Sequence, residues 1–313
     1  MDQISSPTVH ILLATYQGAE HIEEQLKSIA MQTYTQWRLL ISDDGSKDAT
    51  IEIVEEFAKQ HPQKVTLIKG PCKGSTFNFF NLIQKVEYRN DIDLFAFCDQ
   101  DDLWLPDKLE MAANYHQKNP STPLPNLYCG RTRITNGKLD PIGLTKIPKR
   151  PLTFGNALTQ NIASGNTMVF NVPLLKIMRH IAPEHSVWHD WTAYLATTAC
   201  GGTVFYDKEP QLLYRQHSTN VIGANDGLIT RFSRLIPNLK GKYKAWGGLN
   251  EKALSSIENF MNTKTKITYQ AFKKIRDSKN IRARLQNALL AKLYRQSIFE
   301  SIILYGAIIL KRT

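Results

Sequence analysis

Three carboxylates stand close together in the stretch 99–102, which reads DQDD and directly follows the apolar run 93–98. Hard divalent cations such as Mg²⁺ prefer carboxylate oxygens and often keep oxygens of a bound phosphate as further ligands. The stretch therefore indicates a site for a metal ion and a diphosphate. An acidic turn in which Asp102 or Asp107 caps the next helix would explain the same residues equally well.

Two other polar positions follow apolar runs. Asp44 stands after the run 37–42 and is followed by Gly45, whose freedom at positive φ suits a tight turn. A carboxylate there can accept a hydrogen bond from the N–H of a nucleotide base, whereas for Asp43 and Asp48 a turn or a helix cap is the preferred interpretation. Tyr16 ends the first apolar run, where its ring can either stack on a base or pack against the next helix.

The elements that must position these residues alternate along the first 110 residues. Apolar runs predict strands at 9–16, 37–42, 65–68 and 93–98, and helical patterns lie at 19–32, after Asp48, and at 77–86. Strands that alternate with helices indicate an α/β fold with a mostly parallel sheet. Ligands of such sheets bind beyond the carboxyl ends of the strands, which is where the polar clusters fall.

The second half of the chain repeats the pattern less regularly. We expect strands at 127–134, 162–170, 203–206 and 212–215, and a helix at 189–200. From residue 228 onward the pattern is helical and basic. The predicted organisation is therefore a catalytic domain over residues 1–227 and a basic amphipathic helical extension over residues 228–313.

The order and spacing of four motifs resemble glycosyltransferase family 2. They are ATYQ at 14–17, QTY at 32–34, DDGS at 43–46, and DQDD with LPDKL between 99 and 109. The resemblance covers about residues 8–220. It implies the GT-A fold, in which a mostly parallel nucleotide-binding sheet is flanked by helices, and inverting sugar transfer that depends on Mg²⁺ or Mn²⁺.

The resemblance also implies roles for individual residues. Donor-binding residues would be Thr15, Tyr16, Asp44, Lys73, Asp99 and Arg215, and the metal ligands would be Asp101 and His217. The family usually carries Glu-Asp at the start of a late helix, and here the pair is His189-Asp190. Asp190 is thus the expected catalytic base, and the acceptor side would include Gly165, Asn166, His189 and Trp191.

The segment YRQHSTN at 214–220 resembles rhamnosyltransferase-like members of the family. It points to a surface polysaccharide such as an O-antigen or a capsule, with dTDP-rhamnose as one candidate donor and a UDP-sugar as another. The expected acceptor is lipid-linked or a polysaccharide.

Charge is distributed unevenly along the chain. Residues 228–313 hold 18 lysines and arginines against 4 acidic residues, a balance of +14 in a chain whose net charge is +11, which leaves residues 1–227 at −3. Basic residues beside the short apolar runs near the C-terminus suit an anionic membrane surface. A helical bundle with a solvated basic face, or an oligomer contact, is the alternative. We expect no nucleic-acid partner, because no recognised module accompanies the charge.

The expected location is cytoplasmic, at the inner face of the plasma membrane. The four cysteines lack metal-site spacing and suit a reducing compartment, the polar start of the chain has no pattern of a signal peptide, and no apolar run reaches about 18 residues. Two other functions remain open on the sequence. A sugar-nucleotide nucleotidyltransferase would need a glycine-rich phosphate loop that the segment 16–19 does not supply, and the other function is a non-catalytic basic scaffold that binds membranes or nucleic acid.

Overall fold

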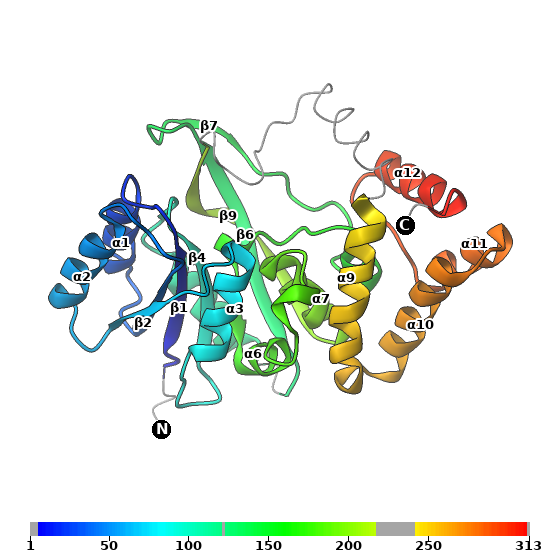
Figure 1. Cartoon of the computed structure of the whole chain (residues 1–313), viewed down its shortest axis with the longest axis horizontal. Helices are drawn as coiled ribbons and strands as arrows, with labels where there is room; N and C mark the ends of the chain where they lie inside the picture. Colours follow the sequence, from blue (N-terminus) through cyan, green and yellow to red (C-terminus); the bar gives the residue numbers. More distant parts are fainter. Residues whose placement is uncertain (1–5, 121–122, 217–241, 312–313) are drawn as a thin grey trace.

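A computed structural model describes residues 6–120, 123–216 and 242–311 of the chain (Figure 1). Within these ranges nine strands form one sheet, in the order β3-β2-β1-β4-β8-β6-β9-β5, with β7 paired to the outer part of β6. The strands are β1 (Val9–Thr15), β2 (Trp37–Asp43), β3 (Val65–Lys69), β4 (Leu94–Asp99), β5 (Leu103–Trp104), β6 (Asn126–Thr135), β7 (Pro141–Leu144), β8 (Val169–Asn171) and β9 (Thr203–Arg215).

The first four strands of the predicted parallel sheet are confirmed, each to within about a residue. β1 pairs in parallel with both β2 and β4, and β2 with β3. The register places Thr15 beside Asp43 and Ala14 beside Asp99. The carboxyl ends of β1, β2 and β4 therefore meet at one edge of the sheet.

The second half of the sheet is mixed rather than parallel. β8 lies antiparallel between β4 and β6, and β5 is antiparallel to β9, while β6 and β9 are parallel. The strand expected at 162–170 is shorter because Gly165–Thr167 form a 3₁₀ turn, η1, before β8. The two short strands expected at 203–206 and 212–215 join into β9, whose pairing with β6 shifts register twice.

Helices cover both faces of the sheet, as the α/β pattern predicts. On one face lie α1 (Ile22–Ala30), α2 (Thr50–Gln60) and α4 (Lys108–Lys118), and on the other lie α3 (Ser75–Lys85), α5 (Phe154–Ala157), α6 (Val172–Met178) and α7 (His189–Ala199). Successive side chains of a strand point to opposite faces. In β1, for example, Ile11 and Leu13 pack into the core on the side of α1, α2 and α4, and Leu12 packs into the core on the other side.

The N-termini of α2 and α6 are formed in different ways. The sequence places the N-cap of α2 at Asp48, but α2 begins at Thr50, and Asp48 Oδ1 instead accepts from both Thr50 N and Thr50 Oγ1. The second Asp48 oxygen accepts from Ala19 N, so Asp48 ties the two loops at the edge of the sheet. α6 begins with Asn171 as its N-cap and a proline in the first turn, a common combination of start signals.

The described part of the C-terminal extension is helical, as predicted. It comprises α9 (Lys242–Ser256), η3 (Glu258–Phe260), α10 (Thr263–Asp277), α11 (Ile281–Leu290) and α12 (Ile298–Ile309). Residues such as Leu254, Tyr269 and Phe272 belong to the same core as Trp191 and Tyr194 of α7. α11 and α12 lie at the opposite end of the long axis from α1 and α2 (Figure 1).

The boundary expected at residue 227 falls outside the described ranges and stays a prediction. Among the helices described, none has both the length and the apolar character needed to cross a bilayer.

Candidate functional site

The acidic stretch forms the loop between β4 and β5, at the edge where β1, β2 and β4 end. Asp102 is buried there, and its Oδ2 accepts a 2.6 Å hydrogen bond from Asn166 Nδ2, while its Oδ1 has no partner among the described residues. Burial first, and then the neighbouring carboxylates Asp101 and Asp99, raise the pKa of Asp102 well above its usual range. Asp102 thus joins the acidic loop to the η1 turn instead of capping α4.

The same loop concentrates negative charge. Burial raises the pKa of Asp99, and the charges of Asp101 and Asp190 raise it further. Within the described residues no three His, Cys, Asp or Glu side chains converge as a complete metal cage. Mg²⁺ usually takes one or two carboxylates together with phosphate oxygens, so Asp99 and Asp101 fit a divalent cation that a bound diphosphate completes.

Gln100, between these carboxylates, holds the loop that follows β1. Its Oε1 accepts from Thr15 Oγ1 at 2.6 Å and from Tyr16 N at 2.9 Å, and its Nε2 donates to Tyr16 O at 3.0 Å. A Cβ added to Gly18 would lie 2.3 Å from Gln100 Oε1, so a glycine is needed for this close approach. Tyr16 is 57% exposed and its backbone is bonded to the acidic loop, so its ring is available to stack on a planar ligand.

Asp44 organises the loop between β3 and α3. Its two carboxylate oxygens accept from Cys72 N and Gly74 N, both at 2.7 Å, so the predicted donor residues Asp44 and Lys73 lie side by side. Lys73 is exposed, with its Nζ 5.8 Å from the centre of the Phe77 ring. Each carboxylate oxygen keeps a further acceptor position, and Asp44 can therefore still accept from a ligand.

Asp190 lies in the first turn of α7. Its charge is one of the causes that raise the pKa of Asp99, after burial and the charge of Asp101. Burial raises the pKa of Asp190 to about 6, although hydrogen bonds from Trp191 N, the Asn161 side chain and Gly165 N oppose the shift. The Gly165 bond measures 3.2 Å and ties the η1 turn to the start of α7. A carboxyl group with this pKa changes protonation near neutral pH and suits a general base.

His189 is a buried, neutral residue beneath Asp190. Its ring stacks on Phe79 at 3.7 Å and meets the Phe97 ring edge-on at 4.8 Å. Burial lowers the pKa of His189 to about 3. Its Nε2 would lie 2.6 Å from a Cβ at Gly165, so His189 and Gly165 are matched in shape. The structure thus places His189 against the η1 turn, whose Gly165 N also bonds Asp190, and the expected place of these residues on the acceptor side stays a prediction.

Trp191 points into the core rather than toward the acidic loop. Its indole Nε1 donates to Ala157 O at 2.7 Å, and its ring packs against Trp188 and, edge-on, against Trp246 of α9. Any influence of Trp191 on an acceptor must therefore pass through the position of α7. The three tryptophans join the C-terminal extension to the helix that carries Asp190.

Arg215, at the end of β9, is buried and bonded to three parts of the protein. It pairs with Glu24 of α1 and donates to Asp101 O at 3.2 Å and to Gly137 O at 2.7 Å. These contacts place the positive charge of Arg215 next to the acidic loop. Its contact with a diphosphate stays a prediction. The expected metal ligand His217 lies outside the described residues.

Sequence reasoning missed two residues of this region. A search for charged residues does not single out Gln100, because glutamine has no charge, although it stands between two aspartates and offers both a donor and an acceptor. Lys108 has a helix-surface residue type, yet it is buried, with its Nζ 4.6 Å from the centre of the Trp104 ring and without a hydrogen-bond partner in the described structure. Burial lowers the pKa of Lys108 to about 8, and the charge of Asp102 opposes this.

Comparison with known proteins agrees with this arrangement. The family model described as "Glycosyl transferase family 2" matches residues 10–180. The dTDP-rhamnosyl transferase RfbG of Shigella flexneri is 31% identical over 71% of this chain and 78% of its own length. The UDP-Glc:alpha-D-GlcNAc-diphosphoundecaprenol beta-1,3-glucosyltransferase WfgD of Escherichia coli is 32% identical over 36% of this chain and 42% of its own length.

A solved structure shares the fold at low sequence identity. The crystal structure of S. aureus TarS residues 1–349 superposes with a TM-score of 0.56 at 14% identity, covering 91% of this chain and 90% of that chain. The shared region covers most of both chains, so the fold is not peculiar to this chain.

Proposed function

Because the chain belongs to glycosyltransferase family 2 and is a glycosyltransferase, we propose that it transfers a sugar from a nucleotide donor in bacterial surface-polysaccharide synthesis. Family membership removes the nucleotidyltransferase and the non-catalytic scaffold as alternatives. The 31% identity to a dTDP-rhamnosyl transferase supports dTDP-rhamnose as the first donor to test, ahead of a UDP-sugar. The similarity to WfgD supports a lipid-linked diphosphate as the acceptor class, with a growing polysaccharide as the other.

The donor nucleotide binds, in this proposal, at the carboxyl ends of β1, β2 and β4. The exposed Tyr16 ring stacks on the base, and Asp44 accepts from a base N–H while it holds the loop that carries Lys73. Lys73 then reaches the base or a phosphate from that loop. Asp99 contacts the ribose. Thr15 also belongs to the donor site, and its hydroxyl group is held in place by its hydrogen bond to Gln100.

The diphosphate lies against the acidic loop, where Asp101 is the metal ligand and Asp99 is close by. A bound Mg²⁺ or Mn²⁺ would offset the charge of the leaving nucleoside diphosphate. Two observations support a cation here. Burial and then the charge of Asp101 raise the pKa of both Asp99 and Asp102, and Asp102 Oδ1 is buried without a partner in the described part of the chain. His217 is proposed as an additional ligand, and Arg215 as a positive charge facing the phosphates.

Asp190 acts as the general base in the proposed reaction. Its carboxylate takes the proton of the acceptor hydroxyl as the oxygen forms a bond to the anomeric carbon. The bond from that carbon to the diphosphate breaks on the opposite side, so the configuration at the carbon inverts. Gly165, Asn166 and His189 shape the acceptor side, because they fix the η1 turn and the start of α7 around Asp190.

One observation carries the proposal: Asp190, at the start of α7, and the acidic loop after β4 are bonded to the same short turn, η1, although they are far apart in the sequence. Gly165 N donates to Asp190 Oδ2 at 3.2 Å, and Asn166 Nδ2 donates to Asp102 Oδ2 at 2.6 Å. This arrangement supports a role for Asp190 as the base beside a loop that binds the diphosphate, at the sheet edge where ligands of such folds are expected. The geometry suits a direct displacement without a protein nucleophile.

The test is a panel of nucleotide sugars with Mg²⁺ or Mn²⁺, scored for nucleoside diphosphate release with and without lipid-linked acceptor. We expect one donor, with dTDP-rhamnose first, to be turned over, and Asp101→Asn to reduce its turnover by at least about 100-fold. Asp107→Asn is the matched control, because Asp107 is an exposed aspartate six residues further along the same segment. Turnover of no donor, or full activity of Asp101→Asn, would sink the proposal.

We place the enzyme at the cytoplasmic face of the membrane, where such donors and lipid-linked acceptors meet. The extension supports this placement, because each lysine or arginine near an anionic leaflet contributes about 1 kcal/mol of attraction. Residues 228–313 carry a balance of +14.

A further inference from the structure

Helix α12 presents an apolar face to solvent. Ile298, Phe299, Ile302 and Leu310 are between 59% and 76% exposed, and Ile308 is the one residue of the helix that is buried. A Cβ added at Gly306, on the same face, would meet nothing within 4 Å. A surface helix normally shows its polar face to water, so α12 has the reverse arrangement.

The helical periodicity makes this face continuous. Positions 298, 302, 306 and 309 follow one another along one side of the helix, and positions 299 and 310 lie beside them. The one charged side chain within α12 is Glu300, which pairs with Arg295 at 3.2 Å on another side. Leu289 and Leu290, at the end of α11, add two exposed apolar side chains in the helix next to α12. Contiguous exposed apolar surface of this kind marks an interaction site.

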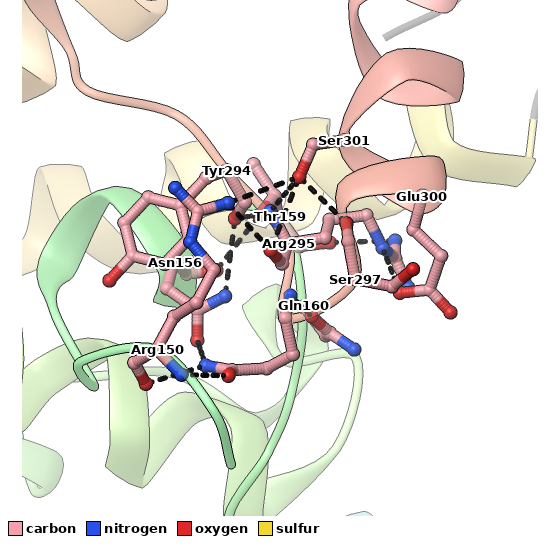
Figure 2. Close-up of polar contacts among 10 residues, drawn as sticks. Arg150, Asn156, Thr159, Gln160, Tyr294, Arg295, Ser297, Glu300 and Ser301 are labelled. Atoms are coloured by element: carbon pink, nitrogen blue, oxygen red, sulfur yellow. Dashed lines mark hydrogen bonds and ion pairs between the residues drawn. The ribbon is translucent and has the colours of Figure 1, made fainter.

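α12 is also held firmly at its base, as Figure 2 shows. Arg150 and Gln296 exchange hydrogen bonds of 2.8 Å and 3.1 Å between backbone and side chain, and Arg150 Nη1 donates to Arg295 O at 3.0 Å. Arg295 Nη1 donates to Thr159 O, and Gln160 Oε1 accepts from Gln296 N, both at 3.0 Å. At the far end Arg284 of α11 donates to Ile309 O.

This network continues to the helix that bears the proposed base. Asn156 of α5 donates to Tyr294 O at 3.1 Å and accepts from Tyr194 of α7 at 2.9 Å. α5 also approaches the backbone of Lys292 so closely that a Cβ at Gly155 would lie 2.2 Å from Lys292 O. α12 is therefore fixed relative to α7, and not attached through a loose linker.

Two features favour a lipid surface as the occupant of this face. α12 has 12 residues and is about 18 Å long, too short for the roughly 30 Å hydrocarbon core but suited to lie in the interface. Exposed basic residues belong to the same pair of helices: Arg282 lies in α11, Lys292 follows α11, and Lys311 follows α12. A second copy of this chain would bring these like charges together, whereas an anionic leaflet neutralises them.

We propose that the apolar face of α12 is a membrane-docking surface that inserts into the interface of an anionic bilayer, and that the basic residues of the α11–α12 pair add electrostatic attraction. Since α12 is tied to α5 and α7, docking fixes the height and tilt of the Asp190 side of the site above the bilayer. This goes beyond attraction by a basic tail, because it assigns the apolar contact to one helix. Docking itself does not depend on the proposed activity.

The test uses the full chain and sedimentation with vesicles of phosphatidylglycerol and phosphatidylethanolamine. We expect the double variant Phe299→Ser/Ile302→Ser to lose at least about tenfold in vesicle affinity. The matched control is Ile267→Ser, which replaces an exposed isoleucine on α10 and should change affinity less than about twofold. High salt screens the electrostatic attraction, so the vesicle affinity that the wild type keeps at high salt reports the apolar contact. The double variant should lose this remaining affinity.

A second variant reads insertion directly. The fluorescence of Ile302→Trp should shift to the blue on adding vesicles and be quenched by brominated lipid, and both effects report burial in the acyl region. Unchanged vesicle affinity of the double variant would overturn the proposal. So would a wild-type dimer in sedimentation velocity that the double variant abolishes with no effect on vesicle binding. Donor turnover without vesicles is measured in parallel, so a failure of the proposed function is distinguished from a failure of docking.

Discussion

Gln100 links the two loops that form the proposed donor pocket, and it does so with three hydrogen bonds to Thr15 and Tyr16. Each such bond contributes about 0.5–1.5 kcal/mol. The side chain lies at the edge of the sheet and supports no strand. Its contribution should therefore appear in donor binding more than in global stability.

We expect Gln100→Ala to raise the KM for the donor about tenfold while the melting temperature changes little. Gly18→Ala should produce the same effect, because its Cβ would collide with Gln100 Oε1. Gln286→Ala, which removes an exposed glutamine of α11, is the control. A donor KM equal to that of the wild type in both loop variants would contradict the role of Gln100.

Asp190 supplies a prediction about pH. Burial raises the pKa of Asp190 to about 6, and the base is active when it is ionised. The kcat of the wild type should thus rise as pH increases through about 6 and then level off. Asp190→Asn should lower kcat by about 100- to 10,000-fold and remove this inflection. A wild-type profile that is flat between about pH 5 and pH 8 would exclude Asp190 as the base.

The same shift has a consequence for stability. A carboxyl group whose pKa is higher in the folded state than in the unfolded state binds its proton more tightly when folded. For Asp190 this contribution to the free energy of unfolding is present at low pH and is lost as pH rises from about 4 to about 6. Relative to the wild type, Asp190→Asn should therefore gain stability with rising pH, which urea unfolding at several pH values measures.

Among the elements, α7 is the one that connects the proposed base to the C-terminal extension. Its first turn carries Asp190, while Trp191 and Trp188 on the same segment pack against Trp246 of α9. The extension thus helps to set where the base stands. Truncating a buried large side chain commonly costs 2–5 kcal/mol, and a half-buried one such as Trp246 costs less.

We expect Trp246→Ala to lower the free energy of unfolding by about 2 kcal/mol and to reduce kcat more than it changes the KM for the donor. The donor loops lie on other elements, which explains the difference between the two constants. Phe260→Ala is the control, because Phe260 is exposed and its ring contacts His180 instead of α7. Equal effects of the two variants on kcat would show that α9 does not position α7.

At the scale of the whole molecule, the C-terminal extension contributes both basic charge and part of the hydrophobic core. The core shared by α7 and α10 includes Tyr194, Leu195, Tyr269 and Phe272, so the helices after residue 241 complete the fold on that side of the sheet. Removing them would expose this core to water.

A chain that ends at residue 216 should therefore melt at a much lower temperature than the full chain, or fail to fold. Thermal unfolding followed by circular dichroism measures this. Because the truncation removes stability together with charge, it is a poor test of membrane binding, and the α12 substitutions are the better one. A truncated chain that melts like the full chain would show that the extension is an independent unit.

The sequence by itself determined the α/β class, the four parallel strands of the first half and the polar residues that follow β1, β2 and β4. Period-two and period-3.6 patterns are local, so strands such as 65–68 and helices such as 189–200 could be predicted to within a few residues. Parallel strands also end at a common edge, which made the meeting of Thr15, Asp44 and Asp99 predictable.

Only the tertiary structure decided which side chains face one another across long separations. Asn166 bonds Asp102, Gly165 bonds Asp190, and Gln100 bonds Tyr16, yet no periodicity encodes these pairs because they depend on how distant elements pack. Packing also sets solvent exposure: Trp191 became a core residue, and the apolar face of α12 stayed exposed to water. A residue type indicates what a side chain can do, but its solvent exposure and its neighbours, which packing sets, determine what it does.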